Sequence, residues 1–163
     1  MGPGEAGRAV ALPDDEYLLR LGKVAYSVGS VEWTVLGDLA GLAGRLPEGL
    51  TVQRLAGLTT GNIAKALRTA LSGITDSTVH AFVEAGADIL GDLSSRRAHV
   101  LHARPATTPD GKQRLYRYRL LPDGRTEAFW IDDEFLDDFM AAITCGERHL
   151  EALRLRPERG SVG

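Results

Sequence analysis

Apolar residues recur every three or four positions along most of the chain, which is the pattern of helices that bury one side. Each such stretch begins near Asp, Thr or Pro residues that suit a helix N-terminus. The third stretch ends before Pro105, which disfavours helical backbone at the residue preceding it. Four amphipathic helices are therefore predicted, at about residues 14–42, 63–73, 76–102 and 132–156.

The first predicted helix contains three glycines, each of which lowers helix propensity by about 1 kcal/mol relative to alanine. Gly22, Gly29 and Gly37 are seven and eight residues apart, so they lie near one face of the helix. A face without side chains lets another helix approach closely. We therefore expect a second helix to pack against this face.

The hydrophobic period changes between the third and fourth helices. Residues 109–111 and 122–124 both read Pro-Asp-Gly, a turn signal. Residues 112–121 and 126–131 have strand patterns, and residues 103–107 can extend as a third strand. The predicted fold class is mainly α: an antiparallel four-helix bundle with a small β-hairpin or meander inserted between helices 3 and 4.

The 163 residues suit one compact domain. We predict a single helical-bundle domain at residues 13–157, with disordered tails at 1–12 and 158–163. The formal net charge of −3 argues against a protein that coats nucleic acid generally. However, residues 96–125 carry eight basic and two acidic side chains, a net +6, which leaves −9 for the rest. The average charge conceals a basic patch.

Nothing in the sequence indicates a membrane or secreted location. Cys145 is the only cysteine, which excludes an intrachain disulfide and a cysteine zinc site. No apolar run approaches the roughly 18 residues of a membrane span, and no N-terminal segment is organised as a signal peptide. We expect a cytoplasmic protein that does not contact membranes. The high content of Ala, Gly, Arg and Leu is typical of GC-rich bacteria.

The most distinctive stretch lies at the predicted end of the third helix, where two arginines and two histidines crowd together: Arg96, Arg97, His99 and His102. A helix C-terminus favours cations, so a structural role is one explanation. The motifs of phosphate loops, dinucleotide folds, zinc proteases and serine hydrolases are absent. His99 and His102 could share a metal on one helix face, but only Glu32 or Asp92 offers a third ligand. We predict no metal and no cofactor.

Arg97 and His102 fit an Arg-x4-His pattern, and Arg96 with His102 fits Arg-x5-His. Such a motif, late in a helix of a small bundle, resembles the HEPN superfamily (higher eukaryote and prokaryote nucleotide-binding domains). The first helix, with Gly-Lys-Val-Ala-Tyr-Ser and then Val-Glu-Trp, also looks like the opening of bacterial members. The resemblance covers most of the chain and implies a single HEPN-like domain.

The resemblance implies metal-independent RNA cleavage by a homodimer in which each protomer contributes one motif. Arg97, with Arg96, would stabilise the charge on the phosphate as the ribose 2′-OH attacks. His102 would accept or orient the 2′-OH proton, and His99 would either support the reacting groups indirectly or assist the leaving group. Glu32, on the first predicted helix, is either an exposed or partner-facing acid or a supporting acid that points at the arginine cluster. The products would be a 2′,3′-cyclic phosphate and a 5′-OH. A toxin or defence component, restrained by an antitoxin or another protein partner, fits this chemistry.

The strand between the two turn signals is predicted to bind RNA. Alternation places Arg114, Tyr116 and Tyr118 on one face, while Arg117 and Arg119 fall on the other among leucines. Arginines interleaved with tyrosines can hold phosphates and stack on unpaired bases. The alternative is that both residue types are simply ordinary on an exposed strand. The candidate RNA-binding residues are Arg104, Arg114, Tyr116, Arg117, Tyr118 and Arg119.

Two other interpretations remain open. In the first, the chain is a non-catalytic HEPN-like bundle that binds nucleotides or proteins. Ala98 favours it, because a polar residue commonly follows the motif arginine in that family. In the second, the chain is an unrelated helical bundle whose arginines cap a helix and pair with acidic helices, and His102 is structural. Convergence of Arg97 and His102 from two chains on an open cleft would favour the enzyme.

Overall fold

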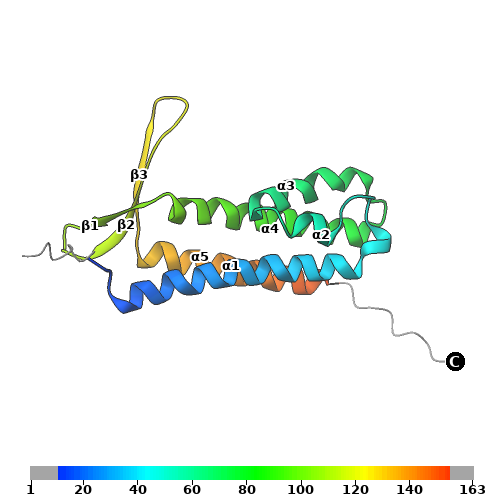
Figure 1. The fold of residues 1–163 in the computed structure, drawn as a ribbon, viewed down its shortest axis with the longest axis horizontal. Helices are drawn as coiled ribbons and strands as arrows, with labels where there is room; N and C mark the ends of the chain where they lie inside the picture. The colour runs from blue at the N-terminus through cyan, green and yellow to red at the C-terminus, as the bar shows by residue number, and fades with distance from the viewer. Residues whose placement is uncertain (1–10, 155–163) are drawn as a thin grey trace, which may run out of the picture.

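A computed structural model describes residues 11–154, which form five α-helices and one three-stranded sheet. Three long helices lie side by side (Figure 1): α1 (Asp15–Gly41), α4 (Ser77–Leu101) and α5 (Asp133–Leu153). The shorter helical segments are η1 (Ala43–Arg45), α2 (Val52–Leu55), α3 (Thr60–Ala70) and η2 (Leu71–Gly73). The predicted tails fall almost wholly outside the described residues.

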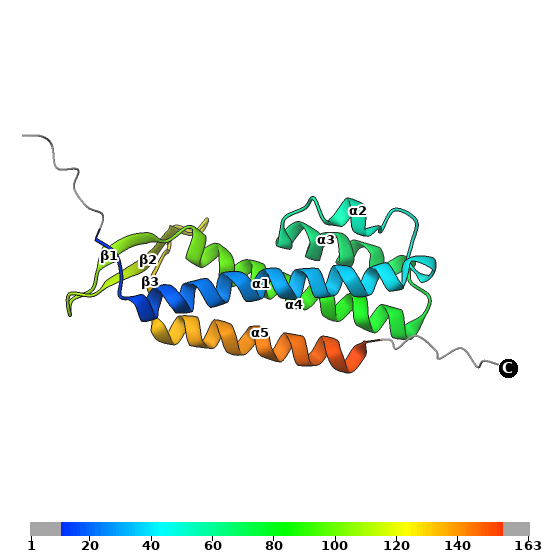
Figure 2. The same ribbon diagram turned by 60° about the horizontal axis from the view of Figure 1, so that its bottom comes forward.

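The long helices differ in direction. α1 and α5 run the same way, because Arg20 bonds Asp137 near their first turns and Arg154 bonds Asp38 near their last. α4 runs opposite to both, and α3 lies along α4 in the reverse direction (Figure 2). The predicted antiparallel order holds for α3 with α4 and for α4 with α5, but it is wrong for α1, which runs the same way as α3 and α5. The connection at residues 42–59 is long enough to return along the molecule before α3 begins.

Each longer helix starts where a side chain accepts a hydrogen bond from a backbone N–H of the first turn. The four capping residues are Asp14, Thr59, Asp76 and Asp132. These caps explain why the predicted helix starts agree with the structure to within a few residues. α4 ends at Leu101, with His102 as its C-cap, as Pro105 predicted.

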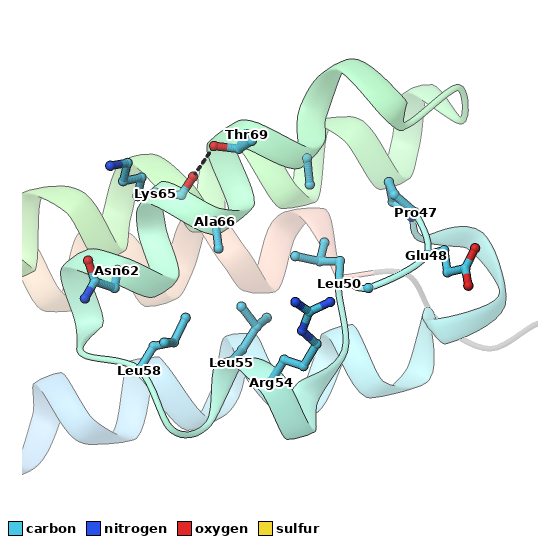
Figure 3. A pocket seen from close by; sticks show the side chains of 12 residues that line it. Pro47, Glu48, Leu50, Arg54, Leu55, Leu58, Asn62, Lys65, Ala66 and Thr69 are labelled. Carbon is cyan, nitrogen blue, oxygen red and sulfur yellow. Dashed lines mark hydrogen bonds between the residues drawn. The ribbon is translucent and has the colours of Figure 1, made fainter.

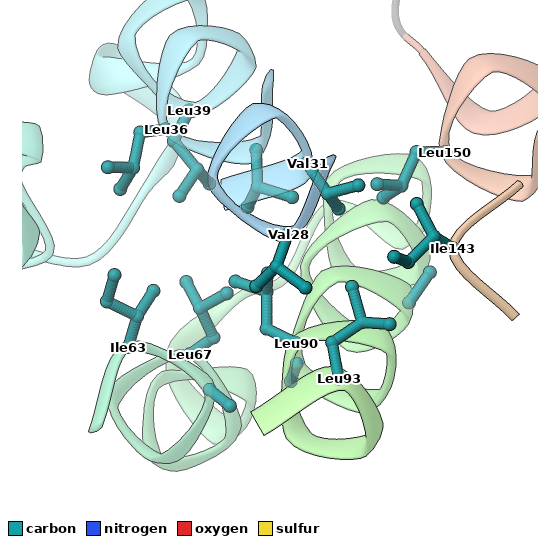
Figure 4. Packing of buried hydrophobic residues seen from close by; sticks show 14 of the residues in the cluster. Val28, Val31, Leu36, Leu39, Ile63, Leu67, Leu90, Leu93, Ile143 and Leu150 are labelled. Atoms are coloured by element: carbon teal, nitrogen blue, oxygen red, sulfur yellow. The ribbon is translucent and has the colours of Figure 1, made fainter. Parts of the chain in front are cut away.

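The hydrophobic core lies between the helices. Figure 4 shows Val28 of α1, Leu67 of α3, Leu90 of α4 and Ile143 of α5 converging on one region. α4 and α5 approach so closely at Gly146 that an added Cβ there would lie 2.8 Å from a methyl carbon of the Ile89 side chain. Burial of these aliphatic side chains is the main favourable term in folding.

The glycine face of α1 is open in this chain. A Cβ added at Gly22, Gly29 or Gly37 would meet nothing within 4 Å. The helix expected against this face is therefore not supplied by residues 11–154.

The sheet is an antiparallel meander in the order β1-β2-β3, which confirms the three-stranded form of the prediction. Its strands are β1 (Arg104–Thr107), β2 (Gln113–Leu120) and β3 (Thr126–Ile131). The turns contain Gly111 and Gly124, whose φ values of 86° and 82° favour glycine. The β2–β3 hairpin stands out from the helices near the end of α4 (Figure 1).

Tyr17 of α1 joins the helices to the sheet. Its hydroxyl donates to the carbonyl oxygen of Ile131 at 2.6 Å and accepts from the N–H of Leu115 at 3.2 Å. Leu115 and Ile131 are partners in the β2–β3 register. The tyrosine therefore binds both strands at once, and burial raises the pKa of its hydroxyl.

The mainly helical class and the inserted sheet are confirmed. Within residues 11–154, no helix is sufficiently long and apolar to cross a membrane.

Candidate functional site

Arg97 connects three helices through a threonine that the sequence did not indicate. Its Nη1 donates to the hydroxyl of Thr60 at 3.2 Å, and this hydroxyl donates to Oε2 of Glu32 at 2.6 Å. Thr60 is buried at the start of α3, whereas Arg97 remains largely exposed. The structure thus brings the predicted arginine and its predicted supporting acid together. Thr60 orients both side chains.

His99 faces the sheet and α5. Its ring packs edge-on against Phe129, with ring centroids 5.2 Å apart, and against Phe135 at 6.4 Å. Its Nδ1 is buried and has no hydrogen-bond partner among the described residues. Burial lowers the pKa of the imidazole, which favours the neutral form. A role for His99 in donating a proton to a leaving group is therefore not supported by its position.

Arg96 and His102 each make other contacts. The Arg96 Nε donates to Oδ2 of Asp92 at 2.8 Å, one turn back on α4. The exposed His102 caps α4, and its carbonyl accepts from Nη1 of Arg117 at 3.0 Å. Within the described chain, no hydrogen bond or ion pair joins any two of the four predicted catalytic residues. One chain does not assemble the predicted catalytic set.

The exposed face of the sheet carries a row of cationic and aromatic side chains. Arg104, Tyr116 and Trp130 are neighbours across the three strands. The Arg104 guanidinium lies 5.8 Å from the centroid of the Tyr116 ring, and the Tyr116 and Trp130 centroids are 4.7 Å apart. Tyr118 continues the same face along β2 and is 55% exposed. We call these four residues the aromatic face.

A shallow cleft of about 310 Å³ lies on the aromatic face. Its walls are His102, Arg104, Tyr116 and Tyr118. The cleft therefore joins the C-cap of α4, which carries the predicted catalytic histidine, to β1 and β2. This is where the structure brings predicted catalytic and predicted RNA-binding residues together.

The prediction that Arg114 binds RNA is wrong. Its side chain is only 5% exposed, and its Nη1 lies 2.7 Å from Oδ2 of Asp14. Its Nη2 lies 3.4 Å from Asp133, and the guanidinium stacks 4.3 Å from the centroid of the Tyr17 ring. Burial lowers the pKa of the guanidinium, but Asp14 and Asp133 outweigh it and hold this pKa above its usual value. Arg114 ties the sheet to the starts of α1 and α5.

The other two candidate arginines lie on the opposite face of β2 from Tyr116. Arg117 is engaged with the carbonyl of His102, and Arg119 pairs with Glu127 at 2.7 Å. Seven of the eight basic side chains counted in residues 96–125 therefore have a hydrogen-bond or ion-pair partner within the described chain. Arg104 is the predicted RNA-binding arginine that lies on the aromatic face.

Trp130 is the functional candidate that sequence reasoning missed. Trp130 lies on β3, whose limits were predicted correctly. Which residue of β2 lies opposite Trp130 depends on the register between the two strands. The Pro-Asp-Gly turn and strand alternation carry a signal for that register, because they place one face of β3 beside Tyr116.

A larger open cavity, of about 570 Å³, lies between α2 and α3 (Figure 3). Leu50, Leu55 and Leu58 form much of its wall, with Arg54 and Lys65 at its edge. None of the predicted site residues lines it. Among residues 11–154, no three His, Cys, Asp or Glu side chains gather where they could hold a metal ion.

These features define a mainly helical protein with a small antiparallel sheet whose open face presents arginine and aromatic side chains. A scan against protein-family models gave no match, and searches of curated proteins and of solved structures gave no significant relative.

Proposed function

We propose that this protein is a HEPN-like helical bundle, built from α1, α3, α4 and α5, that binds single-stranded RNA on its aromatic face. The observation that carries the proposal is the row Arg104–Tyr116–Trp130 across the three strands, with Tyr118 beside it. Adjacent, partly exposed rings on a sheet suit unpaired bases, because every base offers a flat face for stacking.

Different side chains of the row suit the bases and the phosphates of RNA. Tyr118 and the exposed edge of Tyr116 accept bases by stacking. The Arg104 guanidinium, held over the Tyr116 ring, can donate two parallel hydrogen bonds to a phosphate. His102 sits in the same cleft and offers an imidazole ring that can hydrogen-bond to the RNA.

The surrounding charges limit where the RNA can lie. Trp130 also borders a second hollow, whose charged lining is four carboxylates and two cations: Asp110, Asp132, Asp133, Glu134, Lys112 and Arg114. These carboxylates would repel phosphates. The RNA would therefore lie along the sheet from Trp130 toward the turn of the β2–β3 hairpin and would pass His102. It would end before the start of α5.

Binding to single strands and to duplexes distinguishes this proposal from general attraction to phosphate. A fluorescein-labelled ten-nucleotide RNA should bind more tightly than the duplex of the same sequence at equal salt, because paired bases cannot stack on side chains. Anisotropy titrations at several NaCl concentrations measure both affinities. Equal affinity for the two forms, or binding that vanishes at physiological salt for both, would contradict the proposal.

A second candidate function is metal-independent RNA cleavage. The observation that favours it is the placement of two motif residues: Arg97 is exposed and oriented by Thr60, and His102 lines the cleft on the aromatic face. In this reaction the 2′-oxygen bonds to phosphorus while His102 takes its proton. The bond from phosphorus to the 5′-oxygen breaks, and that oxygen gains a proton from water or from the second copy's imidazolium. Arg97 of one protomer would stabilise the phosphate charge.

Cleavage is tested with wild-type protein, Arg97→Ala and His102→Ala on a mixed RNA pool in excess EDTA. If the motif is catalytic, only the wild type cuts, and the fragments end in 2′,3′-cyclic phosphates. Either variant should then lose at least about 100-fold in rate, the usual scale for a general base or a charge-stabilising group. If the RNA stays intact with all three folded proteins, cleavage is contradicted and only the binding function remains. Equal cutting by all three proteins identifies a contaminating nuclease.

A further inference from the structure

The outward face of α1 carries large side chains at a regular interval. Leu19, Tyr26 and Trp33 are seven residues apart and therefore form one stripe along the helix. They are 57%, 82% and 61% exposed, although residues of these types are normally covered. In Figure 2, no other element crosses the front of α1. The stripe is not part of the aromatic face.

The open glycines lie on the same side of α1. Gly22 and Gly29 each fall three residues after one member of the stripe and four before the next, and Gly37 falls four after Trp33. Positions three or four apart are neighbours on a helix surface. The stripe thus alternates large side chains with gaps. The glycines reduce helix stability by about 1 kcal/mol each, and within residues 11–154 a Cβ added at any of the three would meet nothing within 4 Å.

A second copy of α1 fits this surface. If two α1 helices pack antiparallel, with their centres near residues 27 and 28, Tyr26 of one lies against Gly29 of the partner subunit. In the same register Trp33 meets Gly22 of the partner subunit, and Leu19 lies next to the partner subunit's Gly37. Each large side chain then enters a gap. A parallel pairing would instead place each large residue against its own copy.

We infer that the protein forms an antiparallel homodimer through α1, with the large side chains of each copy seated on the glycines of the other. Covering two copies of the stripe buries on the order of 1,000 Å², near the lower limit for a stable interface. Because the dimer has a two-fold axis, both copies use the same surface, and no third copy can join through it. This inference goes beyond RNA binding and does not depend on it.

Substitution of the central glycine separates dimer contacts from helix stability. A Cβ added at Gly29 meets no described atom within 4 Å, and leucine has a higher helix propensity than glycine, so the Gly29→Leu monomer should fold. The same leucine would collide with the partner subunit's Tyr26 and should weaken dimerisation on the order of 100-fold. Ala141→Leu adds a leucine to an exposed position of α5 and serves as the matched control.

Sedimentation velocity of the wild type and the two variants, with circular dichroism as the test of folding, measures the effect. The inference predicts dimeric wild type, dimeric Ala141→Leu and monomeric, helical Gly29→Leu. A monomeric wild type at tens of micromolar would overturn it, and so would a Gly29→Leu protein that remains dimeric.

Disulfide trapping tests the orientation of the helices. Cys145 is exposed and is first replaced by serine. In that background, Leu19→Cys combined with Gly37→Cys should give a covalent dimer, because the two positions meet only between antiparallel copies. Within one chain they are about 27 Å apart along the helix, too far for a disulfide. Equal cross-linking by each single variant would show parallel helices and contradict the antiparallel pairing, as would failure of the double variant to cross-link.

Discussion

Arg114→Met should lower the free energy of unfolding by about 2–3 kcal/mol, although Arg114 belongs to the basic patch that suggested RNA contact. The substitution removes the cation that holds Asp14 and Asp133 together and that stacks on Tyr17. Removing one member of a buried ion pair commonly costs about 3–5 kcal/mol. The expected loss is smaller because both carboxylates are about half exposed and can be rehydrated.

Urea unfolding followed by circular dichroism at pH 7 measures this loss. Arg119→Met is the matched control, since Arg119 is an arginine of the same strand that also pairs with a carboxylate, but its side chain is 44% exposed instead of 5%. Its loss should stay below about 1 kcal/mol, the range of surface ion pairs. Similar losses for the two variants would show that Arg114 does not hold the sheet to the helices.

Tyr116→Ala should weaken binding to single-stranded RNA by about 10–100-fold, the range expected when one stacked base loses its platform. Tyr116 is the central member of the row, because it touches Arg104 on one side and Trp130 on the other. Its removal therefore takes away a stacking surface and the ring that positions the guanidinium. The side chain is half-buried and makes no hydrogen bond that the core needs, so the fold should persist.

Anisotropy titration with the same ten-nucleotide RNA measures the change, and Leu120→Ala supplies the control. Leu120 projects from the same face near the hairpin turn and is exposed, but it has no aromatic ring. Its truncation should change affinity by less than about twofold if stacking, rather than apolar area, holds the bases. Equal effects of the two truncations would contradict a stacking role for Tyr116.

Local patterns predicted the elements well because their causes are local. The caps Asp14 and Asp132 act within one turn of the helices they start, and Pro105 acts on the residue before it. The Pro-Asp-Gly turns likewise fixed the hairpin. The alternation of β2 correctly placed Tyr116 and Tyr118 on one face.

Which charged side chains are paired within the chain could not be predicted in the same way. Arg114 is buried because Asp14 lies beside it, one hundred residues away in sequence. The Arg97–Thr60–Glu32 connection needs three helices in contact before it exists. Net charge counted Arg114, Arg117 and Arg119 as free cations, whereas the tertiary structure gives each a partner. Which cations remain available is a property of packing.

Tryptophan fluorescence tests RNA binding on the aromatic face most directly. The chain has two tryptophans, so Trp33→Phe leaves Trp130 as the only one. Titration of this variant with single-stranded RNA should quench Trp130 emission and saturate at the RNA concentration where anisotropy saturates, because a base stacked at Tyr116 lies beside the indole. Bound RNA, reported by anisotropy, with unchanged Trp130 emission would place the RNA elsewhere and contradict the proposed site.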